Sequence, residues 1–161
     1  MSWDRVKDYL KQFDADERMI SFSVSSATVE LAAQALRVEP ARIAKTLTFR
    51  CGDGCVVLVL AGDARVDNGL FKALFHEKAV MLTPEQVTSM TGHSVGGVCP
   101  FALKEGVPVY LDVSLKRFGT IFPAAGTSSS AIELTPEELF RFSGARDWIC
   151  VSKGWQDASA K

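Results

Sequence analysis

Apolar residues along the chain recur with two different periods, and these predict helices alternating with strands. Helical spacing indicates amphipathic helices over residues 3–13 and 29–36, and Ser25 or Ser26 could cap the second of them. Between them, apolar residues at every second position over 20–24 are typical of a half-buried strand. The first quarter of the chain therefore predicts a strand flanked by two helices.

The next segment predicts a β-hairpin that begins just after a short helix. Pro40 suits the first turn of a helix ending near Lys45, after which residues 46–49 alternate as in a strand. The glycine-containing turn 51–55 separates that strand from the apolar run 56–61. Lys45 is therefore expected at a junction between helix and strand.

Repeated capping signals mark the helices of the second half. The segments Thr83-Pro-Glu-Gln86 and Thr135-Pro-Glu-Glu138 each combine a capping threonine, a proline at the first helical position and a Gln or Glu three residues on. The second of these helices should end at Gly144. A further helix over 70–75 should be capped by Asp67 or Asn68. Strands are expected at 79–82, 107–111, 119–122, 131–134 and 148–151.

The order of these elements predicts the fold class. Strands follow one another without strict alternation with helices, which argues against a doubly wound parallel sheet. We expect a mixed α/β (α+β) domain with a central, mixed but largely antiparallel sheet surrounded by helices. The length of 161 residues favours a single domain over 1–155, followed by a frayed tail over 156–161.

Composition and charge narrow the possible partners. Apolar residues make up 47% of the chain and charged residues 23%, and the net charge of −1 provides no general attraction for DNA or for an anionic membrane. The longest apolar run is of strand length, and no signal peptide is evident, so a cytoplasmic protein is expected. Four scattered cysteines are expected to stay reduced.

Two loops rich in small residues are candidates for ligand binding. Residues 93–100 and 124–130 can expose backbone N–H groups to a carboxyl, ester or phosphate group. In the alternative interpretation, Gly96 and Gly97 only allow the chain to turn. Neither loop matches a P-loop or a dinucleotide-binding motif.

Few side chains have the chemistry of a catalytic group. Lys45 stands among small and apolar neighbours, where its ammonium could face a carbonyl or a phosphate, or it could be a solvated residue at a helix end. Cys99 could act as a nucleophile if His93 approached it, although a small apolar filler is the simpler interpretation. The histidines and cysteines have no metal-site spacing, and no metal is predicted.

The order of several segments resembles the YbaK family of aminoacyl-tRNA deacylases, which includes the editing domain inserted in bacterial prolyl-tRNA synthetase. The resemblance covers about residues 19–152. It rests on Ala44-Lys-Thr-Leu47, 57–63, Ser94-Val-Gly-Gly-Val-Cys-Pro-Phe101, 108–112 and 121–127, taken in that order. It implies the YbaK-like fold, a central sheet with helices around it.

The resemblance also implies the site. Lys45 matches the lysine that is essential for activity in that family. The loop that lines the aminoacyl pocket corresponds to His93, Ser94, Val95, Gly96, Gly97, Val98, Cys99 and Pro100. A second loop that closes the pocket corresponds to Gly126, Thr127 and Ser128. Neither a metal nor another cofactor is implied.

The expected function is that of a trans-editing hydrolase that deacylates mischarged tRNA carrying a small amino acid. The ester is already activated, so positioning and stabilisation of negative charge can suffice for hydrolysis. Ala131 stands where the cysteinyl-specific branch has an acidic residue, so alanine, serine or threonine is a better guest than cysteine. The alternative is a non-catalytic module of the same fold that binds an aminoacyl end, an amino acid or a synthetase.

The expected partner is the acceptor end of an aminoacyl-tRNA. Because the net charge is −1, tRNA would have to dock on a local basic patch, for which the candidates are Arg37, Arg42, Lys45 and Arg50. The same residues could equally form a solvated face. A synthetase or an elongation factor could deliver the substrate, and the sequence identifies neither.

Overall fold

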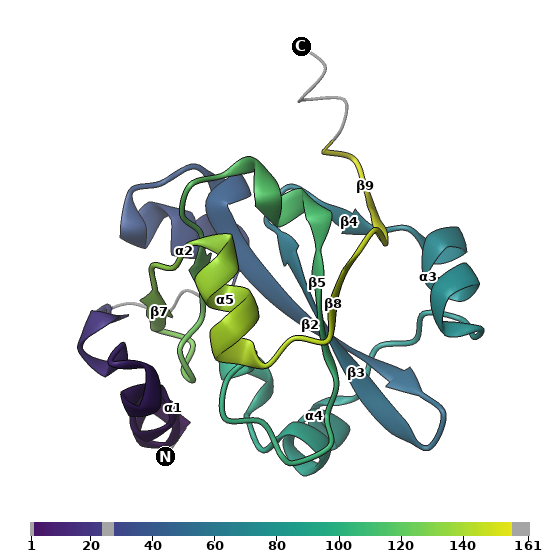
Figure 1. Ribbon diagram of the computed structural model, residues 1–161, viewed down its shortest axis with the longest axis horizontal. Helices are drawn as coiled ribbons and strands as arrows, with labels where there is room; N and C mark the ends of the chain where they lie inside the picture. Colours follow the sequence, from purple (N-terminus) through teal and green to yellow (C-terminus); the bar gives the residue numbers. More distant parts are fainter. Residues whose placement is uncertain (1, 24–27, 156–161) are drawn as a thin grey trace.

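The computed structural model describes residues 2–23 and 28–155. Its centre is a five-stranded sheet in the order β6-β2-β3-β5-β8 (Figure 1). The strands are β2 (Ile43–Cys51), β3 (Gly54–Ala61), β5 (Val109–Asp112), β6 (Phe122–Pro123) and β8 (Asp147–Ile149). Two small antiparallel sheets pair β1 (Met19–Ser21) with β7 (Ser130–Ile132) and β4 (Arg65–Val66) with β9 (Ser152–Lys153).

The predicted mixed α/β fold is confirmed, but the expectation that the central sheet is largely antiparallel is wrong. Only the hairpin β2–β3 is antiparallel, whereas β2–β6, β3–β5 and β5–β8 are parallel pairs. Between β3 and β5 the chain passes through two helices, which is the long crossover that parallel neighbours require. Sequence periodicity identifies strands, but it does not reveal the direction in which distant strands meet.

The helices begin and end largely where the capping signals predict. They are α1 (Ser2–Leu10), α2 (Val29–Leu36), α3 (Asn68–Phe75), α4 (Pro84–Thr91) and α5 (Pro136–Ser143). Both predicted capping boxes are formed, at Thr83 and Thr135, and Gly144 ends α5 in the left-handed conformation. The expected caps Ser25 and Ser26 lie outside the described residues. Thr28 caps α2 by accepting a hydrogen bond from the backbone N–H of Leu31.

Two local predictions differ from the structure. The helix begun by Pro40 is a single 3-10 turn, Pro40–Arg42, so Lys45 lies inside β2 and not at a helix end. Residues 79–82 form no strand and instead contribute one isolated bridge between Phe49 and Met81. At Lys45 the extended conformation of β2 and its pairing with β3 prevail over local propensity. Residues 80–82 lie along the other edge of β2 and bond to it only around Thr48 and Arg50.

The core lies on both sides of the hairpin strand β3, whose residues Cys55–Ala61 are all buried. In Figure 1, α1 and α2 lie on one side of the sheet region and α3 lies on the other. A separate small cluster joins α2 to the edge of the sheet through Ala32, Ala33, Ile43 and Phe122. In the part of the chain that is described, no helix is long and apolar enough to cross a membrane.

Candidate functional site

A pocket of about 240 Å³ lies between α2, the edge of β2 and the two predicted loops. Its wall combines apolar side chains with a lysine, two threonines and a serine. The lining residues are Thr28, Val29, Ala32, Leu36, Ile43–Leu47, Val95, Gly96, Val98, Phe122, Ala124, Ser130 and Ala131.

The pocket forms where the outer edge of β2 is unpaired. Strand β6 pairs with β2 only at Ile43 and Ala44. Further along β2, the carbonyl of Thr48 accepts a hydrogen bond of 3.2 Å from the N–H of Leu82. Residues 45–47 lie between these contacts and keep β3 as their strand partner on the other edge. A gap in the sheet therefore exposes the segment that carries Lys45.

Lys45 is half-buried in the wall of this pocket. Its Nζ donates a hydrogen bond of 3.4 Å to the carbonyl oxygen of Gly62. Burial lowers the pKa of Lys45, an effect that the nearby carboxylates of Asp63 and Glu30 oppose and the charge of Arg65 reinforces. An ammonium has three N–H donors, so two remain for a substrate oxygen.

The partner of Lys45 is held in place by close packing. A Cβ atom on Gly62 would lie 2.0 Å from the carbonyl oxygen of Pro40, so only glycine allows the two backbone segments to approach this closely. The N–H of Gly62 also donates to the carbonyl of Ala41. The carbonyl that orients Lys45 is therefore part of a rigid backbone contact.

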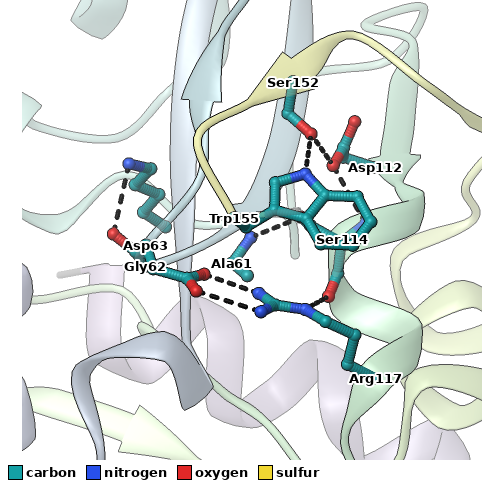
Figure 2. Close-up of polar contacts among 9 residues, drawn as sticks. Ala61, Gly62, Asp63, Asp112, Ser114, Arg117, Ser152 and Trp155 are labelled. Carbon is teal, nitrogen blue, oxygen red and sulfur yellow. Dashed lines mark hydrogen bonds and ion pairs between the residues drawn. The ribbon is translucent and has the colours of Figure 1, made fainter. Parts of the chain in front are cut away.

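A polar network fixes the turn after β3, which carries the hydrogen-bond acceptor of Lys45 (Figure 2). Arg117 binds the carboxylate of Asp63 through two hydrogen bonds of 2.5 and 3.0 Å, and its Nε donates to the carbonyl of Ser114. The hydroxyl of Ser114 accepts a hydrogen bond from the N–H of Ala61. The buried carboxylate of Asp112 accepts from the N–H of Ser114 and from Ser152. These contacts anchor residues 61–63, and with them the acceptor of Lys45.

The two predicted loops meet beside the pocket. A Cβ atom on Gly97 would lie 2.6 Å from the carbonyl oxygen of Gly126 and 2.8 Å from the Cα of Thr127. Gly126 has φ +105°, and a Cβ atom there would lie 2.8 Å from the carbonyl oxygen of Ser2. Both glycines are thus required by packing. Gly96 lines the pocket itself, as does Val98.

Two hydroxyl groups of the pocket have roles that the sequence analysis did not assign. The Oγ of Ser130 accepts hydrogen bonds from the N–H groups of Ala125 and Thr127 and donates to the carbonyl of Thr127. Ser130 therefore holds the second loop in shape. The Oγ1 of Thr46 is buried and, within residues 2–23 and 28–155, has no hydrogen-bond partner. Spacing alone carries no signal for either role.

His93, Cys99 and Pro100 are buried behind the loop and do not line the pocket. The Nε2 of His93 lies 2.7 Å from the carbonyl oxygen of Phe101 and 3.7 Å from the Sγ of Cys99. Since a carbonyl only accepts, this nitrogen carries the proton and is no base for the thiol. Burial raises the pKa of Cys99 to about 12. The arrangement supports the interpretation of Cys99 as a filler, not as a nucleophile.

Comparison with known proteins identifies the family. The model of the aminoacyl-tRNA editing domain matches residues 24–142 of this chain. The chain belongs to this family. The editing domain is 50% identical to the uncharacterised protein YwhH of Bacillus subtilis (strain 168), over 97% of the chain and 100% of YwhH.

Two further similar proteins are a synthetase and a solved structure. The editing domain is 31% identical to the proline–tRNA ligase of Thermosipho melanesiensis over 88% of the chain, but it spans only 26% of that ligase. A crystal structure described as a candidate trans-editing enzyme for prolyl-tRNA synthetase superimposes with a TM-score of 0.86 at 30% identity. The match covers 95% of this chain and 98% of the other. The resemblance seen in the sequence is confirmed.

The residues of the predicted basic patch do not line the pocket as a group. Of its four residues only Lys45 lines the pocket. Arg42 donates to the carbonyl of Thr120 and pairs with Glu133 at 3.5 Å. Arg50 is exposed near the far end of β2. Among the described residues there is no group of three or more His, Cys, Asp or Glu side chains that could hold a metal ion.

Proposed function

We propose that this editing domain is a trans-editing hydrolase that removes a small amino acid from mischarged tRNA, with Lys45 as its catalytic residue. The observation that carries the proposal is the ammonium of Lys45 in the wall of a small, mostly apolar pocket. Membership of the editing family supports the reaction class. The likeness to a candidate trans-editing enzyme supports action on tRNA released from a synthetase.

The size of the pocket favours a small guest. Its volume of about 240 Å³ is below the roughly 300–1,000 Å³ typical of sites for drug-sized ligands. Val29, Ile43 and Phe122 supply apolar surface, and the described lining contains no carboxylate that would pair with a basic side chain. Alanine, serine and threonine fit this chemistry. A synthetase pocket discriminates poorly against such residues, since one methylene is worth only about 1–3 kcal/mol.

The reaction needs little from the protein beyond positioning and charge stabilisation. A water molecule, hydrogen-bonded to the free hydroxyl of the terminal ribose, attacks the ester carbonyl, and negative charge develops on the carbonyl oxygen. The two remaining N–H donors of Lys45 stabilise that oxygen. The ester C–O bond then breaks, and the terminal ribose oxygen of the tRNA leaves and takes up a proton. When water attacks, the products are the free amino acid and uncharged tRNA.

Hydrolysis by wild type and by a Lys45→Ala variant tests this proposal on a panel of tRNAs charged with alanine, serine, threonine and cysteine. We expect the variant to lose about 10²–10³-fold in kcat, as on loss of one donor to a developing oxyanion. Lys104→Ala is a matched control, because Lys104 also donates to a backbone carbonyl, that of Ser89, but lies outside the pocket. Equal rates for Lys45→Ala and Lys104→Ala would contradict the proposal.

A second candidate is a binding module without activity. It is favoured by the absence of an imidazole, thiol or carboxylate from the described lining, so no general base of the protein faces the pocket. Tight binding of an intact aminoacyl ester without hydrolysis would support it. Either role would place the protein with charged tRNA in the cytoplasm. Delivery by a synthetase or an elongation factor is a further part of the proposal, and co-purification of either protein with this one would test it.

A further inference from the structure

A second hollow, of about 420 Å³, adjoins the Lys45 pocket. The two share Gly96 in their walls, so the glycine loop forms the boundary between them. We call this second space the Arg5 hollow. Its lining is polar and small, and consists of Ser2, Arg5, Ser94, Gly96, Gly97, Gly126, Thr127 and Ser128.

Arg5 brings a positive charge to this hollow, and within residues 2–23 and 28–155 it pairs with no carboxylate. Its Nη1 donates to the carbonyl of Gly92 at 2.8 Å and its Nη2 to the carbonyl of Ala102 at 3.0 Å, which fixes the guanidinium in place. In the described part of the chain, Arg18, Arg42 and Arg117 form ion pairs, whereas Arg5 forms none.

The charge of Arg5 is available to a ligand in two respects. A guanidinium has five N–H donors, and two neutral carbonyls leave donors free without reducing the charge. Among the described residues that line the hollow there is no carboxylate, so an anion there would meet no like charge from them. The hollow is therefore suited to an anion that accepts hydrogen bonds.

Gly96 differs from the other glycines of the loops because packing does not explain it. A Cβ atom there would lie 3.5 Å from the Cβ of Ser128, which is ordinary van der Waals contact, and its φ is not in the left-handed region. Gly97 and Gly126, by contrast, would clash with backbone atoms at 2.6 and 2.8 Å. Neither packing within the protein nor backbone conformation therefore requires glycine at position 96. Because Gly96 has no side chain, none projects from this residue at the boundary between the pocket and the hollow.

We propose that the Arg5 hollow binds the last phosphodiester and nucleotide of the acceptor strand, while the amino acid occupies the Lys45 pocket and the substrate crosses the loop at Gly96. This rests on the proposed function. An aminoacyl group is attached to a terminal ribose, so a phosphate must lie about one nucleotide from it. A fixed guanidinium matches phosphate oxygens, and the hydroxyls of Ser2 and Ser94 line the same space. Because the net charge of the chain is −1, RNA binding needs a local positive charge, and Arg5 supplies one.

Binding of two non-hydrolysable analogues tests the proposal without requiring catalysis. Both carry alanine in amide linkage on a 3′-aminoadenosine. One is the free nucleoside, and the other continues through a 5′-phosphodiester to a second nucleotide. Affinities are measured by calorimetry at several salt concentrations for wild type, Arg5→Gln and Arg5→Lys. Arg146→Gln removes one exposed charge elsewhere and serves as the matched control.

We expect wild type to bind the phosphodiester analogue about ten-fold more tightly than the nucleoside, the range of a charge-assisted hydrogen bond. Arg5→Gln should lose this gain while it still binds the nucleoside, and the slope of its log affinity against log salt should fall by about one. Arg5→Lys should keep part of the gain, and Arg146→Gln all of it. Gly96→Val should weaken binding of both analogues and leave the melting temperature unchanged.

Three outcomes would overturn the inference. Equal wild-type affinity for the two analogues would show that the phosphate gains nothing from the hollow. An equal loss of affinity for both analogues in Arg5→Gln would show that Arg5 only supports the loop. An unchanged preference for the phosphodiester analogue in Arg5→Gln would place the phosphate elsewhere. If wild type bound neither analogue, the proposed function itself would fail, which is a separate result.

Discussion

Ser130 provides the sharpest test of how the site is held together. Its Oγ takes part in three hydrogen bonds, accepting from the N–H groups of Ala125 at 3.2 Å and Thr127 at 3.1 Å and donating to the carbonyl of Thr127 at 3.0 Å. Ser130→Ala removes all three without changing the packing of the chain. The loop that borders both the pocket and the Arg5 hollow then keeps only the hydrogen bond from the N–H of Ser129 to Thr127 Oγ1 among its side-chain hydrogen bonds within the described residues.

The expected loss of stability follows from burial. Ala125 is fully buried, so its N–H would be left without a partner or water, at a cost of about 1–3 kcal/mol. Thr127 is only half-buried, so water can partly replace the lost contact and the additional cost is about 1 kcal/mol. We therefore expect Ser130→Ala to lower the free energy of unfolding by about 2–4 kcal/mol.

Urea denaturation of Ser130→Ala and Ser129→Ala measures this difference. Ser129 is the matched control, because its substitution removes the same hydroxyl one residue away. Its hydrogen bonds within the described residues are made by its backbone, whose N–H donates to Thr127 Oγ1 and whose carbonyl accepts from the N–H of Phe22. Its free energy of unfolding should change by no more than about 0.5 kcal/mol. Equal midpoints for the two variants, with unchanged denaturant dependence, would refute the structural role assigned to Ser130.

Three further predictions concern single side chains. Thr46→Val should raise the free energy of unfolding by about 1 kcal/mol. It replaces a buried hydroxyl that has no hydrogen-bond partner among the described residues with a methyl group of similar size. A lower urea midpoint for the variant would contradict this. With a pKa of about 12, only about one Cys99 thiol in 10⁵ is ionised at pH 7. Iodoacetamide should therefore modify the exposed Cys150 and leave Cys99 intact until the protein unfolds. Peptide mapping that finds Cys99 modified in the native protein would refute this. Hydrogen bonds from Arg18 lower the pKa of Glu138 to about 2, so the unfolded state binds more protons between that value and the ordinary 4.5, and stability from this carboxylate is lost as pH falls through that range. The stability difference between wild type and Glu138→Gln should therefore shrink from pH 5 to pH 2, and a constant difference would count against the ion pair.

The sequence by itself determined the helices and the hairpin, because both depend on neighbouring residues. Capping boxes at Thr83 and Thr135 are local hydrogen-bonding arrangements, and both form as predicted. The hairpin between β2 and β3 needs only a short turn and two apolar strands. The family followed from the order of several such segments, which the family model confirms.

Tertiary structure alone decided how these elements meet and which residues reach the site. The parallel pairs of the sheet join strands far apart in the sequence, and their direction depends on how the crossovers pack. Lys45 faces a pocket because the pairing of β6 with β2 ends at Ala44, which no local pattern foretells. Arg5 binds the carbonyls of Gly92 and Ala102, which are far from it in the sequence, whereas His93 and Cys99, despite their place in the loop, are turned into the core. Local propensity specifies conformation, but only long-range packing decides which side chains remain at a surface and which are buried.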